Sequence, residues 1–238
     1  MTLQALGEGL RTVSTSIRLG LGLELPLRCT VVSLSTGGVA LISPVAFDDA
    51  AAAAIEALGP VEHLIAPNLL HHLHLPAAIA RWPRARVHGA PELSKKRPDV
   101  RFDAVLGSEL IDRHLETIAI AGAPAISEHA LFHRPSRALV VTDLLFHVHR
   151  PRGVLTPWIL RLVGAPAGTL AQSRLWRLST KDRAAAAASA RALLELGPER
   201  LVLAHGEPVL EDVPARLERA LAWMLGRAPA ALPSTTGV

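Results

Sequence analysis

The sequence predicts a mixed α/β fold (class α+β) in which sheets are covered on their outer faces by helices. Three features of the chain support this fold class. β-rich runs flank a Ser35-Thr36-Gly37-Gly38 turn near the start. Strand and helix patterns then alternate, and a second hairpin precedes a final helix, strand and helix. At 238 residues, we expect a single domain over 1–238, with an ordered core at about 10–225 and a flexible tail at 226–238.

The N-terminal elements predict a strand, a hairpin and a helix. Residues 10–18 alternate polar and apolar side chains, which is typical of a half-buried strand. The runs 29–34 and 39–42 are rich in β-forming residues and flank the Gly-Gly turn, which predicts a hairpin. Residues 47–58 are alanine-rich, carry acidic residues near their start and end at Gly59-Pro60, which predicts a helix.

The rest of the chain predicts shorter elements. The expected strands are 63–66, 86–88, 117–120, 129–133, 138–142 and 201–204; the expected helices are 75–82, 91–96, the run from about 183 to 196, and 213–225. The Pro-containing turn 134–137 joins two of these strands as a second hairpin. The apolar segment 154–164 predicts a core-packing helix, with a lid, a dimer surface and a membrane-surface contact as alternatives.

Composition and charge exclude several classes of protein. Hydrophobic residues make up 50% and charged residues 19% of the chain, which is unlike a disordered protein. The net charge of +4 is spread out, and the short run Lys95-Lys96-Arg97 has no interleaved aromatics, so we expect no nucleic-acid partner. Cys29 is the single cysteine, which rules out an intrachain disulfide or a multi-cysteine metal site. We expect neither a transmembrane segment nor a secretory signal, and hence a cytoplasmic protein.

Histidine is the residue type left to carry chemistry, with eleven in the chain. His71, His72 and His74 follow the predicted strand 63–66, Asp143 follows 138–142, and His205 follows 201–204. Polar groups beyond the ends of buried strands are a common setting for functional sites. Imidazole and carboxylate groups suit zinc first, and also iron or manganese. We therefore expect His71, His72, Asp143 and His205 to bind one divalent metal.

Each of these residues also has a purely structural interpretation. Asp143 could cap the following segment, and His205-Gly206 could be a turn in which glycine supplies an unusual φ. We expect His147 and His149, which lie near Arg150 and Arg152, to be solvated. His63, His88 and His114 carry no functional signal. A chain without bound metal remains the alternative.

The order of these parts resembles the metallo-β-lactamase superfamily. The resemblance rests on the His-rich junction at 71–74, on Thr142-Asp143-Leu144-Leu145-Phe146 and on Leu203-Ala204-His205-Gly206-Glu207. It implies a four-layer αββα sandwich, mostly found in hydrolases with one or two metals at the sheet edge. Four segments (66–72, 96–99, 132–137 and 141–143) resemble more narrowly a branch of that superfamily whose members carry a domain of unknown function.

The chain departs from the superfamily's first motif, His-x-His-x-Asp-His. Aligning His72 with the last histidine places His71 at the aspartate and Leu69 and Pro67 at the first two histidines. The resemblance places the family's middle histidine near Ala125, where Glu128 or His129 would be a substitute. We expect Glu128 or His74 to act as the general base.

Two functions of different classes follow. The first is a metal-dependent hydrolase of an ester, amide, thioester or phosphoester small molecule. The alternative is a non-catalytic member of the same fold that binds a ligand or protein through a degenerate site. Iron-based redox chemistry is a third option, and a homodimer is the assembly we consider.

Overall fold

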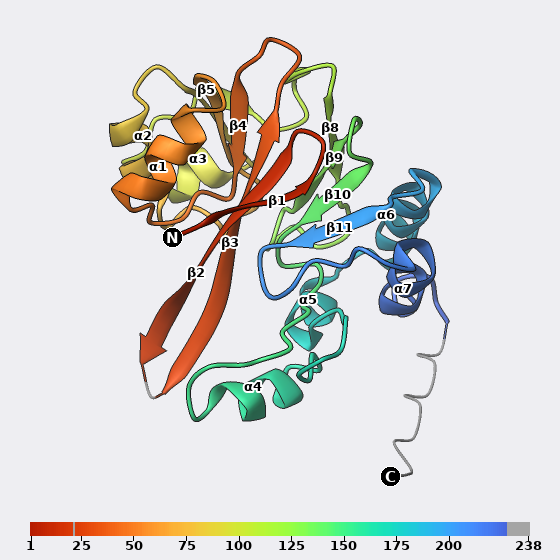
Figure 1. The fold of residues 1–238 in the computed structure, drawn as a ribbon. Helices are drawn as coiled ribbons and strands as arrows, with labels where there is room; N and C mark the ends of the chain where they lie inside the picture. Colours follow the sequence, from red (N-terminus) through yellow and green to blue (C-terminus); the bar gives the residue numbers. More distant parts are fainter. Residues whose placement is uncertain (21, 228–238) are drawn as a thin grey trace.

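Two β-sheets packed face to face form the centre of the protein, and helices cover both outer faces (Figure 1). The computed structural model describes residues 1–20 and 22–227. The tail expected to be flexible lies, from residue 228 onward, outside the described residues. Within them, no helix combines the length and apolar character needed to cross a membrane.

The larger sheet contains seven strands in sequential order. Its strands are β1 (Leu3–Gly7), β2 (Leu10–Gly20), β3 (Leu23–Ser33), β4 (Val39–Ile42), β5 (Val61–Ala66), β6 (Arg86–Gly89) and β7 (Ala104–Val105). The first four strands pair antiparallel, which confirms the β3–β4 hairpin. The last four pair parallel. Each of the three connections between these parallel strands contains a helix, because parallel neighbours cannot be joined by a tight turn.

The smaller sheet has the order β11-β10-β9-β8. Its strands are β8 (Leu115–Ala119), β9 (His129–His133), β10 (Ala138–Val141) and β11 (Arg200–Leu203). β9 and β10 form the predicted second hairpin. β10 and β11 pair parallel, with Val141 opposite Leu203, so the two strands end side by side.

Seven helices lie outside the sheets in the described part of the chain. They are α1 (Asp49–Glu56), α2 (Leu75–Arg81), α3 (Leu93–Lys96), α4 (Thr156–Leu162), α5 (Arg174–Ser179), α6 (Arg183–Glu195) and α7 (Val213–Ala220). α1 begins where the acidic residues predict it: the Asp48 carboxylate accepts a hydrogen bond from the Ala51 N–H. α7 ends earlier than predicted, at Ala220, and is followed by turns.

Three separate hydrophobic clusters show that the fold has four layers. One cluster joins α1–α3 to the larger sheet, and includes Ile55, Leu75 and Leu64. A second fills the space between the sheets, with Ile42 and Ile65 from one sheet and Val140 from the other. The third joins the smaller sheet to α5, α6 and α7. The αββα sandwich expected from the resemblance is therefore confirmed.

The sequence does not predict the outer part of the long hairpin that β2 and β3 form. The sequence predicts only 10–18 and 29–34, whereas both strands are eleven residues long and pair as far as Gly20 opposite Leu23. The outer half of β3, residues 23–28, is uniformly half-buried, so it lacks the regular alternation of a strand with one covered face. It extends away from the sandwich toward α4 (Figure 1).

A contact between half-buried His63 on β5 and buried His88 on β6 makes stability depend on pH. His63 Nδ1 lies 2.8 Å from His88 Nε2, and His88 is 1% exposed. Burial, followed by the nearby His63, lowers the pKa of His88 to about 4. Because the unfolded chain protonates this group near pH 6.5, stability is full above that pH and falls as pH decreases toward 4.

We therefore expect acidification from pH 7 to pH 4 to cost about 2–3 kcal/mol through His88. Urea unfolding at both pH values measures this loss, and His88→Phe should reduce the difference between them. An unchanged pH dependence in that variant would assign the loss to other groups.

Candidate metal centre

Three strand ends bring polar side chains together at one edge of the sandwich. Asp143 lies two residues beyond Val141 of β10, and His205 lies two residues beyond Leu203 of β11. Because Val141 and Leu203 are paired in register, Asp143 and His205 leave the sheet at the same level. His71 comes from the turn that follows β5 in the facing sheet.

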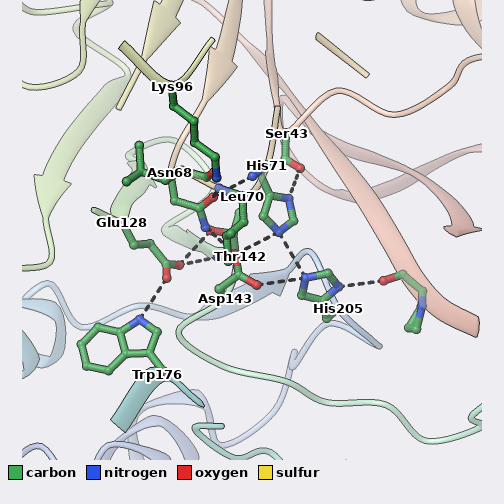
Figure 2. A network of polar contacts seen from close by, with 12 residues as sticks. Ser43, Asn68, Leu70, His71, Lys96, Glu128, Thr142, Asp143, Trp176 and His205 are labelled. Carbon is green, nitrogen blue, oxygen red and sulfur yellow. Dashed lines mark hydrogen bonds and ion pairs between the residues drawn. The ribbon is translucent and has the colours of Figure 1, made fainter. Parts of the chain in front are cut away.

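The side chains of His71, Asp143 and His205 converge on a common point (Figure 2). His71 Nε2 lies 3.1 Å from His205 Nε2 and 3.2 Å from Asp143 Oδ2. His205 Nε2 lies 3.3 Å from Asp143 Oδ1. All three side chains are largely shielded from solvent.

The opposite ring nitrogens of both histidines are held by other residues. His205 Nδ1 donates a hydrogen bond to the carbonyl of Pro26 at 2.9 Å. His71 Nδ1 bonds the Ser43 hydroxyl at 2.6 Å. The ring of Phe146 stacks on that of His205, with centroids 4.7 Å apart. In metalloproteins such outer contacts orient the metal-binding imidazoles. Here they leave both Nε2 atoms directed at the common point.

The donor set fits a divalent cation. A neutral His205 that donates from Nδ1 presents an acceptor lone pair at Nε2, directed at a carboxylate that is also an acceptor. Such a convergence of acceptors requires a shared cation or proton between them. Across a tetrahedral zinc with bonds of 2.0–2.1 Å, ligand atoms are about 3.3 Å apart. The observed separations of 3.1–3.3 Å lie close to this value.

Two buried carboxyl groups near the site differ in their pKa values. Burial alone would raise the pKa of Asp143, but His71 and His205 hold it well below its ordinary value. Burial, and then the charge of Asp143, raises the pKa of Glu128 to about 7. The site therefore keeps its anionic charge on Asp143, where a cation would be bound.

Asn68 is a buried amide that connects the elements of the site, and its role was missed in the sequence. Its Nδ2 donates to Thr142 Oγ1 and Asp143 Oδ2, and its Oδ1 accepts from the backbone N–H groups of Leu70 and His71. Asn68 thus fixes the turn that carries His71 against the end of β10 (Figure 2). Only its position directly after β5 and Pro67 could have drawn attention to it.

The structure does not bring His72, Glu128 or His74 into this group. His72 Nδ1 contacts Arg97 Nη1 at 2.8 Å, on the other side of the turn. Glu128 is 1% exposed and accepts from the Thr142 N–H, the Thr142 hydroxyl and the Trp176 indole N–H. His74 lies at the N-terminus of α2.

The structure corrects two predictions about histidines and confirms one about a glycine turn. The sequence predicts both His71 and His72 as metal ligands, but only His71 lies in the cluster with Asp143 and His205. The expectation that His147 is solvated is wrong: it is 2% exposed, bonded to the Glu207 carbonyl and near Arg216 Nη2. The Gly206 turn is confirmed, since φ is +106° and a Cβ there would collide with the His147 carbonyl.

A pocket of about 380 Å³ lies beside His205. It is lined by Pro26, which contacts His205, by Gly206, and by residues of the β2–β3 hairpin and of the 150–152 segment. Its charged lining residues are Glu24, Arg28, Arg150, Arg152 and Glu207. Basic groups therefore outnumber acidic ones.

Comparison with solved structures identifies the class of fold. A metallo-β-lactamase from Pontibacter korlensis superposes with a TM-score of 0.64 at 12% identity, over 95% of this chain and 99% of that chain. A metallo-β-lactamase from Hirschia baltica gives 0.63 at 11% identity, over 94% and 97%. The flavodiiron core of Flv1 from Synechocystis sp. PCC6803 gives 0.63 at 14%, over 94% of this chain and 60% of that chain.

The protein has the metallo-β-lactamase fold, as the resemblance implies. No protein-family model matches the sequence, and no curated protein matches it either. The narrower relationship to one branch of the superfamily therefore stays a prediction.

Proposed function

We propose that the protein is a metal-dependent hydrolase whose metal is bound by His71, Asp143 and His205. The observation that carries this proposal is the convergence of two imidazole Nε2 atoms and a carboxylate at 3.1–3.3 Å. Three protein ligands leave a coordination position open for water or substrate, as in catalytic rather than structural zinc sites. Zinc suits this donor set first, and iron and manganese are alternatives.

Each residue has a distinct task in this proposal. A bound divalent metal would supply a water of lowered pKa and polarise a carbonyl or phosphoryl oxygen. Ser43 and Pro26 hold the two rings in orientation, and Asn68 holds Asp143 against the His71 turn. Glu128 is better placed as a positioning residue than as the general base, because its oxygens already accept hydrogen bonds from Thr142 and Trp176.

The pocket beside His205 favours a substrate with an anionic group. Arg150 and Arg152 are exposed, and neither forms an ion pair with a residue that the structure describes. Burial lowers the pKa of Arg28 to about 10, so this group remains charged at neutral pH. A phosphoester, or an ester that carries a carboxylate, would bind these arginines.

The proposal is tested by metal reconstitution followed by hydrolysis assays. The chain is loaded with zinc, iron(II) or manganese(II) and assayed with p-nitrophenyl acetate, p-nitrophenyl phosphate and a thioester. We expect about one ion per chain and turnover that a chelator abolishes. Failure to bind metal would refute the proposal.

Metal binding without turnover of any ester class would favour the alternative, a non-catalytic ligand-binding protein. One observation keeps this alternative open. Within the described residues the candidate metal group has three members. If His71 takes the place of the motif's last histidine, the aspartate and the two histidines before it are replaced by Leu70, Asn68 and Ala66.

A further inference from the structure

Six of the thirteen large hydrophobic side chains that are exposed in the described part of the chain lie on or beside α4 and α5. Trp158 is 71% exposed and Leu178 is 83% exposed. We use the name α4–α5 face for six exposed apolar residues and three exposed arginines. The apolar residues are Val154, Leu155, Trp158, Leu162, Leu175 and Leu178. The arginines are Arg152, Arg161 and Arg174. Exposed apolar groups collected in one region of a protein usually mark a contact with a partner or a membrane.

The members of this face lie on neighbouring elements. Leu155, Trp158 and Leu162 are three and four residues apart, which places them along one side of α4. The N–H of Arg174 donates to the Val163 carbonyl at 2.7 Å, so α5 begins beside the end of α4. Leu175 and Leu178 then follow at helical spacing on α5. Both helices lie at the end of the molecule toward which the β2–β3 hairpin extends (Figure 1).

The charged residues of the chain segment that carries this face all have the same sign. Residues 144–181 contain five arginines and Lys181 but no aspartate or glutamate. Arg152, Arg161 and Arg174 are exposed and form no ion pair within the described part of the chain. Elsewhere on the surface, arginines such as Arg81, Arg86 and Arg134 are paired with carboxylates.

We propose that the α4–α5 face binds the surface of an anionic lipid bilayer. Tryptophan and leucine beside arginine are the residues that enter the interfacial region, where apolar groups leave water and arginines contact lipid phosphates. Anionic headgroups would supply the negative charge that the face lacks. A second copy of the chain is a poorer occupant, because two such faces would bring arginines of like charge together.

The proposal is tested by co-sedimentation of the full chain with vesicles. Vesicles of equal parts phosphatidylglycerol and phosphatidylcholine are compared with pure phosphatidylcholine at low and high salt. We expect binding to the anionic vesicles that weakens as salt increases. The emission of the exposed Trp158 should shift to shorter wavelength, since Trp176 and Trp82 are already buried and Trp223 packs against the cluster of the smaller sheet and α5–α7.

Variants identify the residues responsible. Arg161→Glu removes one positive charge and adds one negative charge, so at about 1 kcal/mol per charge it should lower the partition coefficient about 30-fold. The double variant Trp158→Gln/Leu178→Gln should lower it at least about tenfold. Leu110→Gln and Arg113→Glu are matched controls on an exposed loop away from the face, and should bind like the unmodified chain.

Three outcomes would overturn the proposal. The first is equal sedimentation with anionic and neutral vesicles. The second is undiminished binding by Arg161→Glu and by the double variant. The third is a dimer in analytical ultracentrifugation that the double variant converts to a monomer, which would assign the face to a second copy of the chain.

Discussion

Replacing Asp143 with alanine should abolish stoichiometric metal binding and any metal-dependent hydrolysis. The substitution removes the only carboxylate of the group and leaves two imidazoles with their Nε2 atoms 3.1 Å apart. A divalent ion would lose both a bond and its charge partner. We expect metal content to fall from about one ion per chain to less than about a tenth of that. Elemental analysis after dialysis measures this directly.

Asp49→Ala is the matched control for that experiment. Asp49 is an exposed carboxylate at the start of α1, paired with Arg81 and remote from the site. It should retain full metal content and activity. A full ion on the Asp143→Ala chain would show that the metal is bound elsewhere.

Asn68→Ala should weaken metal binding about 10- to 100-fold without removing any of the three ligands. The substitution deletes the hydrogen bonds that hold Asp143 and the His71 turn in place. It also leaves the backbone N–H groups of Leu70 and His71 without their acceptor. We expect a loss of stability of about 2–4 kcal/mol. Chelator competition and urea unfolding measure the two effects.

Gln172→Ala separates the Asn68 network from the general cost of removing a buried amide. Gln172 is fully buried, but its side-chain oxygen and nitrogen have no hydrogen-bond partner in the described structure. This variant should bind metal with unchanged affinity. Equal weakening by both substitutions would mean that Asn68 acts only through overall stability.

The strands and helices with strong local signals could be predicted from the sequence. The β3–β4 and β9–β10 hairpins follow from turn residues between β-rich runs, and α1 and α6 follow from acidic caps before alanine-rich runs. The positions of Asp143 and His205 were also predictable, because each follows a buried apolar strand. Parallel pairing of those two strands then brings the residues together.

The choice between His71 and His72 could not be made in this way. Neighbouring side chains in a turn point in different directions, and which one faces the site depends on Asn68 and Ser43. Ser43 follows β4 and Pro26 lies on β3, far from His71 and His205 in sequence. Their residue types carry no signal of this role. The burial of His147 was missed for the same reason, because Glu207 and Arg216 approach it only in the folded chain.

The metal contents of His71→Ala and His72→Ala, compared with the unmodified chain, test the central claim most directly. Both variants remove one imidazole from the same turn, so their general effects on folding should be similar, and circular dichroism verifies this. We predict that the unmodified chain and His72→Ala each bind about one ion per chain, while His71→Ala binds almost none. Loss of metal in His72→Ala with retention in His71→Ala would contradict the site described above.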